Sequence, residues 1–376
     1  MDGDIRIIEA KSKKDLAEFI LFPWKIYRGQ RKYKNWVPPL IIDEKSTLNK
    51  EKNPFYKHAE SANFIAYKDG KIAGRISAII DRNYIDFHND KCGFLGFFES
   101  YEDQEVASAL FSTAEEWVRE RGLNRIMGPM NPSTNHMLGV LIDSFERPPV
   151  VQMNYNPPYY VNLYQRAGYH KEKDLYCYMM DNTLPLSDKI RRVAEISRKR
   201  NRVEVRSINM KRFDQEVEKI HELYNSTWER NWGFVPWTKE EFEHMAKDLK
   251  LIAIPELVTM AFIEGRLVGI SIPLPDINEI LIRMNGRLLP TGIFKLLFGK
   301  NRVSRMRLAI FGVRREYRNK GIDGIFVYET YRKGQNMGFK EADFSWILED
   351  NYPLRNLLEA WGTTHYRTYR IYGKEL

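Results

Sequence analysis

A basic turn that carries two glycines is the segment of this chain best suited to chemistry. It follows an apolar run that ends at Val313, and it contains Arg318, Lys320, Gly321 and Gly324. We expect a strand to end at Val313 and a helix to begin near Gly321, so that unpaired backbone N–H groups at the helix start can bind an anion. Arg318 and Lys320 add positive charge, and a glycine lets the anion approach the backbone closely. The segment therefore predicts a phosphate or pyrophosphate site.

The same turn resembles the cofactor loop of the GNAT superfamily of N-acetyltransferases, which binds the pyrophosphate of acyl-coenzyme A. The family pattern is Arg or Gln, two residues, Gly, one residue, and then Gly or Ala. Arg318 and Gly321 match this pattern, whereas Asp323 stands at the last position and Gly324 follows one place later. The resemblance implies acyl-coenzyme A as a substrate, bound by residues of this region: Val313, Arg318, Lys320, Gly321, Gly324 and Asn351.

The chain repeats one plan twice, and this repeat predicts its domain organisation. Gly70 and Gly74 lie in an Asp-Gly hairpin pattern, and Gly265 and Gly269 repeat it 195 residues later. A further apolar strand, a long helix, a glycine and another strand follow in both halves. The resemblance implies an α/β (α+β) fold with two tandem GNAT-like domains, each a mixed, mostly antiparallel sheet flanked by helices. We predict these divisions: domain 1–182, basic linker helix 183–202 and domain 203–376.

Two carboxylates at a strand end are candidates for proton transfer. In the resembling fold the thioester lies between two strands that part, here expected at 308–313 and 342–348. Glu349 and Asp350 follow the second of these strands and could relay the proton of the amine. Asn351 comes next, and it could bind the amide arm of the cofactor or cap the following helix.

The first half lacks the basic loop but keeps a different part of the family pattern. Where the loop should fall, residues 99–105 contain four acids and no glycine. Tyr164 and Gly168 resemble the late family signature whose tyrosine protonates the departing thiolate. Tyr164 could therefore be a general acid, or it could be a packed core residue.

Aromatic residues in the second half could form the wall of an acceptor pocket. Trp228, Trp232 and Trp237 lie within ten residues, in a segment that overhangs the acceptor site in the resembling fold. They could equally be core beneath a long loop. Two long insertions, 128–154 and 279–300, are expected to be lids or walls beside a cleft.

Composition limits the choice of compartment and partners. The 376 residues carry a net charge of +9, which favours an anionic partner such as a cofactor pyrophosphate. There are only two cysteines, no secretory signal and no apolar run long enough to cross a bilayer, so we expect a cytoplasmic protein. The basic stretch lacks the interleaved aromatics of a nucleic-acid platform, and no HExxH or CxxC pattern predicts a metal.

The leading functional prediction is an N-acyltransferase. It would move an acyl group from acyl-coenzyme A, or from another thioester carrier such as an acyl-carrier protein, to a small-molecule amine. One alternative is an aminoacyl-tRNA-dependent transferase like the cell-wall peptide-bridge enzymes, which resemble this chain in having tandem domains. The other is a non-catalytic protein that binds a small molecule or thioester, because Asp323 and the acidic 99–105 segment depart from the family pattern.

Overall fold

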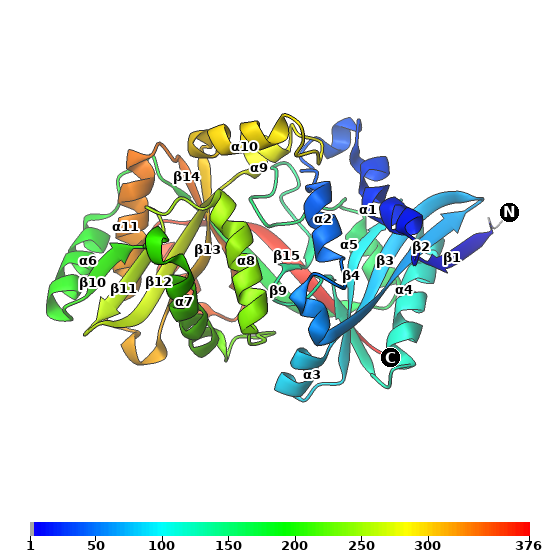
Figure 1. The fold of residues 1–376 in the computed structure, drawn as a ribbon, viewed down its shortest axis with the longest axis horizontal. Helices are drawn as coiled ribbons and strands as arrows, with labels where there is room; N and C mark the ends of the chain where they lie inside the picture. Colours follow the sequence, from blue (N-terminus) through cyan, green and yellow to red (C-terminus); the bar gives the residue numbers. More distant parts are fainter. Residues whose placement is uncertain (1–3) are drawn as a thin grey trace. The chain divides into compact units, whose positions relative to one another are not determined.

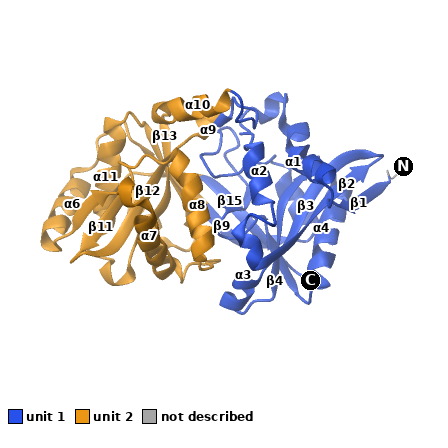
Figure 2. Ribbon diagram, in the orientation of Figure 1, with its two compact units in different colours: residues 1–175, 281–290, 367–376 blue, residues 176–280, 291–366 orange. Residues whose placement is uncertain are grey.

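The computed structural model describes residues 4–376, which form two compact units (Figure 2). Among these residues, unit 1 contains 4–175, 281–290 and 367–376, and unit 2 contains 176–280 and 291–366. The units are therefore discontinuous in sequence. The predicted division at 183–202 was sequential. In this grouping, the later segments 281–290 and 367–376 belong to unit 1.

Unit 1 is a mixed sheet with helices on both faces (Figure 1). Its strand order is β1-β2-β3-β4-β5-β15, antiparallel except for the parallel pair β4 and β5. Its strands are β1 Ile5–Glu9, β2 Ala59–Lys68, β3 Lys71–Asp81, β4 Cys92–Ser100, β5 Arg125–Gly128, β6 Met130–Asn131, β7 Met137–Leu138 and β8 Val140–Leu141. Its helices are α1 Lys13–Tyr27, α2 Ile41–Thr47, α3 Arg82–His88, α4 Gln104–Arg119 and α5 Tyr160–Arg166, with short 3-10 turns η1 Arg31–Tyr33 and η2 Pro54–Lys57.

Unit 2 repeats the arrangement. Its strand order is β9-β14-β13-β12-β11-β10, in which β13 and β14 are the parallel pair. Its strands are β9 His170–Asp181, which begins in unit 1, β10 Glu204–Ser207, β11 Thr259–Ile263, β12 Arg266–Pro275, β13 Arg305–Val313 and β14 Glu341–Leu348. Its helices are α6 Asp188–Arg200, α7 Phe213–Trp228, α8 Lys239–Ile252, α9 Asn278–Leu281, α10 Gly292–Gly299, α11 Ile322–Asn336 and α12 Tyr352–Ala360, with 3-10 turns η3 Met210–Arg212, η4 Lys300–Arg302 and η5 Arg315–Tyr317. The predicted mixed α/β architecture is confirmed.

The two predicted hairpins are present and use the same turn. Lys68 pairs with Lys71 across Asp69 and Gly70, and both turn residues have positive φ, 52° and 71°. In unit 2, Glu264 and Gly265 repeat this geometry with φ of 50° and 78°. Two residues of positive φ match the twist of a tight hairpin, which is why the sequence pattern predicted both turns.

In each unit, helices cover opposite faces of the sheet at the end of the hairpin. A Cβ on Gly74 would lie 2.6 Å from Leu110 of α4, whereas the neighbouring Arg75 donates a hydrogen bond to Phe19 O of α1. Successive residues of a strand point to opposite faces, so α4 and α1 lie on opposite sides of β3. In unit 2 the corresponding glycine, Gly269, faces Phe326 of α11.

The last strand of the chain, β15 (Thr364–Glu375), completes the sheet of unit 1. Its residues Tyr372 to Glu375 pair antiparallel with Gly128 to Arg125 of β5. Lys374 adds an ion pair of 2.9 Å with Glu115 of α4. The final ten residues therefore belong structurally to the first half of the chain.

Cys92 and Cys177 are both buried. Residues 4–376 contain no group of three or more His, Cys, Asp or Glu side chains placed to bind a metal ion. Within the same residues, no helix combines the length and the apolar character needed to span a membrane.

Candidate active site

A half-buried glutamate at the end of β4 is the best-placed acid of unit 1. Glu99 pairs with Arg75 of β3, and its side chain shares the face of the sheet that α1 covers. The hydroxyl of Tyr27, the last residue of α1, donates a hydrogen bond to Glu99 Oε2 at 2.7 Å. Tyr160 of α5 donates a second hydrogen bond to the same oxygen at 2.6 Å. Residues from three distant parts of the sequence therefore orient one carboxyl group.

Aromatic rings pack around Tyr27, which donates a hydrogen bond to this carboxyl group. Tyr27 stacks on Trp36 with ring centroids 4.7 Å apart, and it contacts Tyr33 and Tyr155 edge to face. Apolar surroundings exclude water and strengthen the electrostatic interactions of the carboxyl group. We call Glu99, Arg75, Tyr27 and Tyr160, together with these rings, the Glu99 cluster.

The environment of the Glu99 cluster favours proton uptake. Burial raises the pKa of Glu99, and Arg75 opposes this shift. Burial also raises the pKa of Glu44, a buried carboxyl on which Arg75 acts in the opposite direction. A carboxyl whose pKa lies above its ordinary value is better matched to accept a proton near neutral pH. This arrangement can therefore act as a general base.

The strands next to Glu99 part as the resembling fold predicts. β4 and β5 pair only from Cys92 to Phe94. Beyond this point Asn131 of β6 enters, and its side-chain oxygen accepts a hydrogen bond from Phe97 N at 2.6 Å. This backbone N–H is therefore engaged by the protein itself.

The turn after β4 is closed by acids. The Asp103 carboxylate caps α4 and accepts hydrogen bonds from the backbone N of Glu105 and Val106 at 3.1 and 3.2 Å. Lys68 forms ion pairs of 2.7 Å with Asp103 and Glu105. Protein groups thus occupy the helix start where a phosphate would bind.

The predicted cofactor loop of unit 2 has the expected backbone shape but is covered. β13 ends at Val313, and Gly321 caps α11 with a φ of 69°. A Cβ on Gly321 would lie 2.9 Å from Ser197 Oγ of α6, and one on Gly324 would lie 3.2 Å from Val193. Ser197 also donates a hydrogen bond to Lys320 O. An anion could contact both glycines only if α6 moved away.

The basic residues Arg318 and Lys320 both lie on this turn. Arg318 donates hydrogen bonds to Val313 O at 3.3 Å and to Thr227 O at 3.0 Å. The Lys320 ammonium lies 4.8 Å from the ring centre of Tyr317. Both side chains are exposed on the turn.

The acids predicted for proton transfer follow β14. β13 and β14 pair only from Arg305 to Leu308 and then part, as expected for the resembling fold. Glu349 and Asp350 form the turn after β14, where Glu349 O accepts a hydrogen bond from Arg355. Asn351 caps α12 by accepting a hydrogen bond from Leu354 N at 3.4 Å, which was one of its two predicted roles.

The other predicted site residues lie in packed surroundings. Tyr164 is fully buried in unit 1 and stacks on Tyr372 with ring centroids 5.0 Å apart. No hydrogen-bond partner for its hydroxyl lies among residues 4–376, and burial raises its pKa. This packing favours the core role over the general-acid role. In unit 2 Trp237 is buried, Trp228 stacks on Tyr224 of α7, and Trp232 is half-buried.

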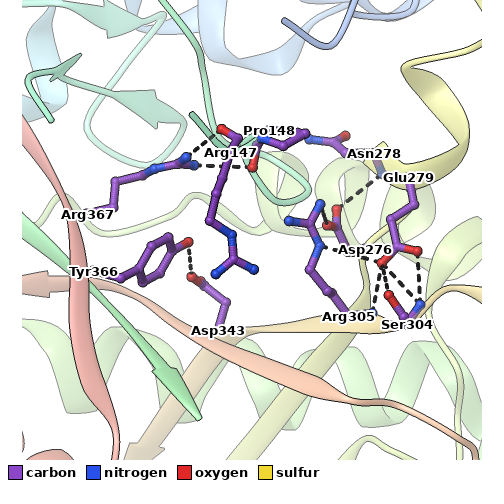
Figure 3. A network of polar contacts seen from close by, with 10 residues as sticks. All are labelled: Arg147, Pro148, Asp276, Asn278, Glu279, Ser304, Arg305, Asp343, Tyr366 and Arg367. Carbon is purple, nitrogen blue, oxygen red and sulfur yellow. Dashed lines mark hydrogen bonds and ion pairs between the residues drawn. The ribbon is translucent and has the colours of Figure 1, made fainter. Parts of the chain in front are cut away.

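Polar networks fix the loops around each sheet (Figure 3). In unit 2 the Glu279 carboxylate accepts hydrogen bonds from Ser304 N, Ser304 Oγ and Arg305 N, which fixes the start of β13. Tyr366 donates a hydrogen bond of 2.7 Å to Asp343 of β14. In unit 1 the buried Arg367 donates hydrogen bonds to the backbone oxygens of Ser144, Arg147 and Pro148.

Sequence reasoning missed Glu99. It counted Glu99 only as one of four acids that would repel a pyrophosphate. The available signal was its position directly after the apolar strand that ends at Phe98, together with the aromatic stretch around Trp36. The partners Tyr27 and Tyr160 could not be paired with it from spacing alone.

A model of the acetyltransferase (GNAT) family matches residues 29–137, which include Arg75 and Glu99. Two relatives match nearly the whole chain. The "Bacterial ceramide synthase" of Caulobacter vibrioides (strain NA1000 / CB15N) is 33% identical over 385 residues, 100% of this chain and 98% of the relative. "Protein YghO" of Escherichia coli (strain K12) is 35% identical over 373 residues, 97% of this chain and 94% of the relative.

Solved structures share the fold at low identity. The glucosamine N-acetyltransferase region of a fungal multi-domain GH3 β-N-acetylglucosaminidase has a TM-score of 0.59 and 16% identity, over 100% of this chain and 38% of that one. A tandem GNAT protein from the clavulanic acid biosynthesis pathway has a TM-score of 0.56 and 11% identity, over 99% of this chain and 98% of that one. These likenesses support two GNAT-like folds in tandem.

Proposed function

The chain belongs to the GNAT acyltransferase family, and we propose that it transfers a fatty acyl group from acyl-coenzyme A to the amine of a long-chain amino alcohol. One observation carries this proposal: a relative named as a ceramide synthase is 33% identical along the full length of the chain. A ceramide is the amide of a fatty acid and a long-chain amino alcohol, so its synthesis is N-acyl transfer.

In the proposed reaction, Glu99 is the general base. The amine nitrogen attacks the thioester carbonyl carbon, a C–N bond forms, and the C–S bond breaks. Glu99 accepts the proton that the amine loses, and the coenzyme A thiolate leaves and takes up a proton. Tyr27 and Tyr160 orient the carboxyl group through their hydrogen bonds of 2.7 and 2.6 Å.

A second arrangement keeps the residues predicted from sequence. Glu349 and Asp350 would then relay the proton, with the three tryptophans of unit 2 as the acceptor wall. The loop of Arg318 would bind the pyrophosphate, assisted by Val313, Lys320, Gly321, Gly324 and Asn351. The parting of β13 and β14 after Leu308 favours this arrangement, but the cover that Val193 and Ser197 form over the loop disfavours it.

Lys320 distinguishes the two arrangements because it is exposed on the loop. If the loop binds the pyrophosphate, Lys320→Ala should weaken coenzyme A binding by about tenfold, as expected for one charge-assisted contact. Unchanged binding by calorimetry, with the matched variant Lys71→Ala as control, would place the pyrophosphate elsewhere.

The proposed compartment is the cytoplasm, because two cysteines in 376 residues are too few for a disulfide framework. The acyl donor could also reach the protein on an acyl-carrier protein, which carries the same thioester.

The reaction is tested with the purified full chain, a long-chain acyl-coenzyme A and a long-chain amino alcohol. Mass spectrometry should detect the amide, and a thiol reagent should detect an equal amount of free coenzyme A. If the amide formed only when an acyl-carrier protein supplied the acyl group, the proposed donor would be wrong but the proposed N-acyl transfer would stand. Transfer only from aminoacyl-tRNA, or binding of thioester without turnover, would overturn the proposal.

A further inference from the structure

Helix α10 of unit 2, which is labelled in Figure 1, carries large apolar side chains that are exposed. Phe294, Leu297 and Phe298 are 60%, 49% and 72% exposed, whereas Leu296 on the opposite side of the helix is buried. Leu251, at the end of α8, is 65% exposed, and its backbone oxygen accepts a hydrogen bond from Lys300 at 3.1 Å. A cluster of exposed rings and leucines of this kind is characteristic of an interaction surface.

The chain segment that contains this helix carries charge of one sign. Residues 280–302 contain no aspartate or glutamate, and they include five cations: Arg283, Arg287, Lys295, Lys300 and Arg302. Lys295 is exposed between the outward-facing Phe294 and Leu297, and Arg302 is exposed just beyond the helix. Apolar and cationic side chains therefore share one surface, which we call the α10 face: Leu251, Phe294, Lys295, Leu297, Phe298 and Arg302.

We propose that the α10 face docks on the surface of a membrane that contains anionic lipid. Aromatic and leucine side chains enter the boundary between headgroups and acyl chains, while lysine and arginine contact lipid phosphates. The helix is too short to span a bilayer, so the contact is peripheral. This inference concerns a surface, and it does not depend on which substrate the chain acylates.

A second copy of the chain fits this surface less well. In a two-fold symmetric contact the same patch would face itself. Lys295 and Arg302 of one copy would then lie against cations of the other, with no acid within residues 280–302 to pair with them. An anionic surface satisfies both the apolar and the cationic side chains.

The test is sedimentation of the full chain with lipid vesicles. Vesicles of phosphatidylcholine with roughly one third phosphatidylglycerol should bind the protein more tightly than phosphatidylcholine alone. Phe294→Ser and Phe298→Ser should each weaken binding to the mixed vesicles by about tenfold or more, since each removes an inserted ring. Lys295→Glu should weaken binding to the mixed vesicles but not to neutral ones.

The matched controls come from other surfaces of the chain. Leu184 is 60% exposed and lies outside residues 280–302, so Leu184→Ser removes a similar apolar side chain from another segment of the chain. Lys71→Glu gives the same charge reversal in the first hairpin. Equal vesicle binding by the α10 variants and the wild-type chain would overturn the proposal. The proposal would also be overturned if the α10 variants bound vesicles like the wild-type chain but formed smaller oligomers in solution. This result would assign the α10 face to self-association.

Discussion

Equivalent positions in the two sheets carry an acidic residue in unit 1 and a glycine in unit 2. In unit 1 the residue paired with Arg75, directly after the hairpin glycine, is Glu99, and the last residue of α1, Tyr27, donates a hydrogen bond to it. In unit 2 the residue paired with Ile270, directly after Gly269, is Gly312. The last residue of α7, Trp228, lies against Gly312 so closely that a Cβ there would be 2.4 Å from its ring.

This difference shows that two repeats of one fold can carry different residues at the same place and so can have different roles. Unit 1 has an acid with a hydroxyl partner at the strand end, whereas unit 2 fills the same place with an indole ring. The following turns are also closed differently, by the Asp103 carboxylate in unit 1 and by Val193 and Ser197 of α6 in unit 2. Catalysis from unit 1 and packing from unit 2 is the simplest assignment.

Removing the acid should give the largest effect on activity. Glu99→Gln keeps the size of the side chain but cannot accept the proton, so kcat for amide formation should fall between about 10²- and 10⁴-fold. Steady-state kinetics at saturating acyl-coenzyme A and amine would measure the loss. The matched variants Glu349→Gln and Asp350→Asn should retain activity within a few-fold. If Glu349→Gln or Asp350→Asn lost activity and Glu99→Gln retained it, the general base would lie in unit 2.

Filling the glycine of unit 2 should affect stability rather than chemistry. Gly312→Ala forces a methyl group against the Trp228 ring, so the free energy of unfolding should fall by about 1–3 kcal/mol. Urea unfolding would measure this change. The smaller ring in the double variant Gly312→Ala with Trp228→Phe should reduce the loss relative to the sum of the single variants. Additive losses would show that this contact is relaxed in solution.

The pH dependence should shift modestly with the partners of Glu99. Burial raises the pKa of Glu99, so amide formation should decline on acidification at a pH above the ordinary glutamate range. Tyr27 opposes this shift by donating a hydrogen bond to the charged form, so Tyr27→Phe should move the decline to higher pH. A pH–rate profile would measure both positions.

Stability should change with pH in the corresponding direction. Because the folded pKa of Glu99 is raised, the native state binds more protons than the unfolded state between the two pKa values. The free energy of unfolding should therefore decrease as pH rises through the folded pKa, and Glu99→Gln should lose this slope. Tyr164→Phe is the matched control, because its hydroxyl lacks a hydrogen-bond partner within residues 4–376. A large activity loss in this control would restore its predicted role as an acid.

Features encoded over short stretches of sequence could be predicted. The hairpins followed from Asp69-Gly70 and Glu264-Gly265, because positive φ at these residues is a local property. The Glu99 cluster could not be predicted, because its partners lie 72 and 61 residues away in sequence. The cover over Gly321 escaped prediction for the same reason, since Ser197 precedes Lys320 by 123 residues.

The position of β15 has a consequence for how the chain matures. The sheet of unit 1 is completed by residues 367–376, which emerge from the ribosome only after all of unit 2 has been made. Until then β5 presents an open strand edge, which is a template for wrong pairing. Unit 1 must therefore remain unfinished through most of synthesis, and closing it requires contacts of very long sequence separation, which form slowly. A ribosome that stalls within unit 2 would release a first half that is prone to aggregation.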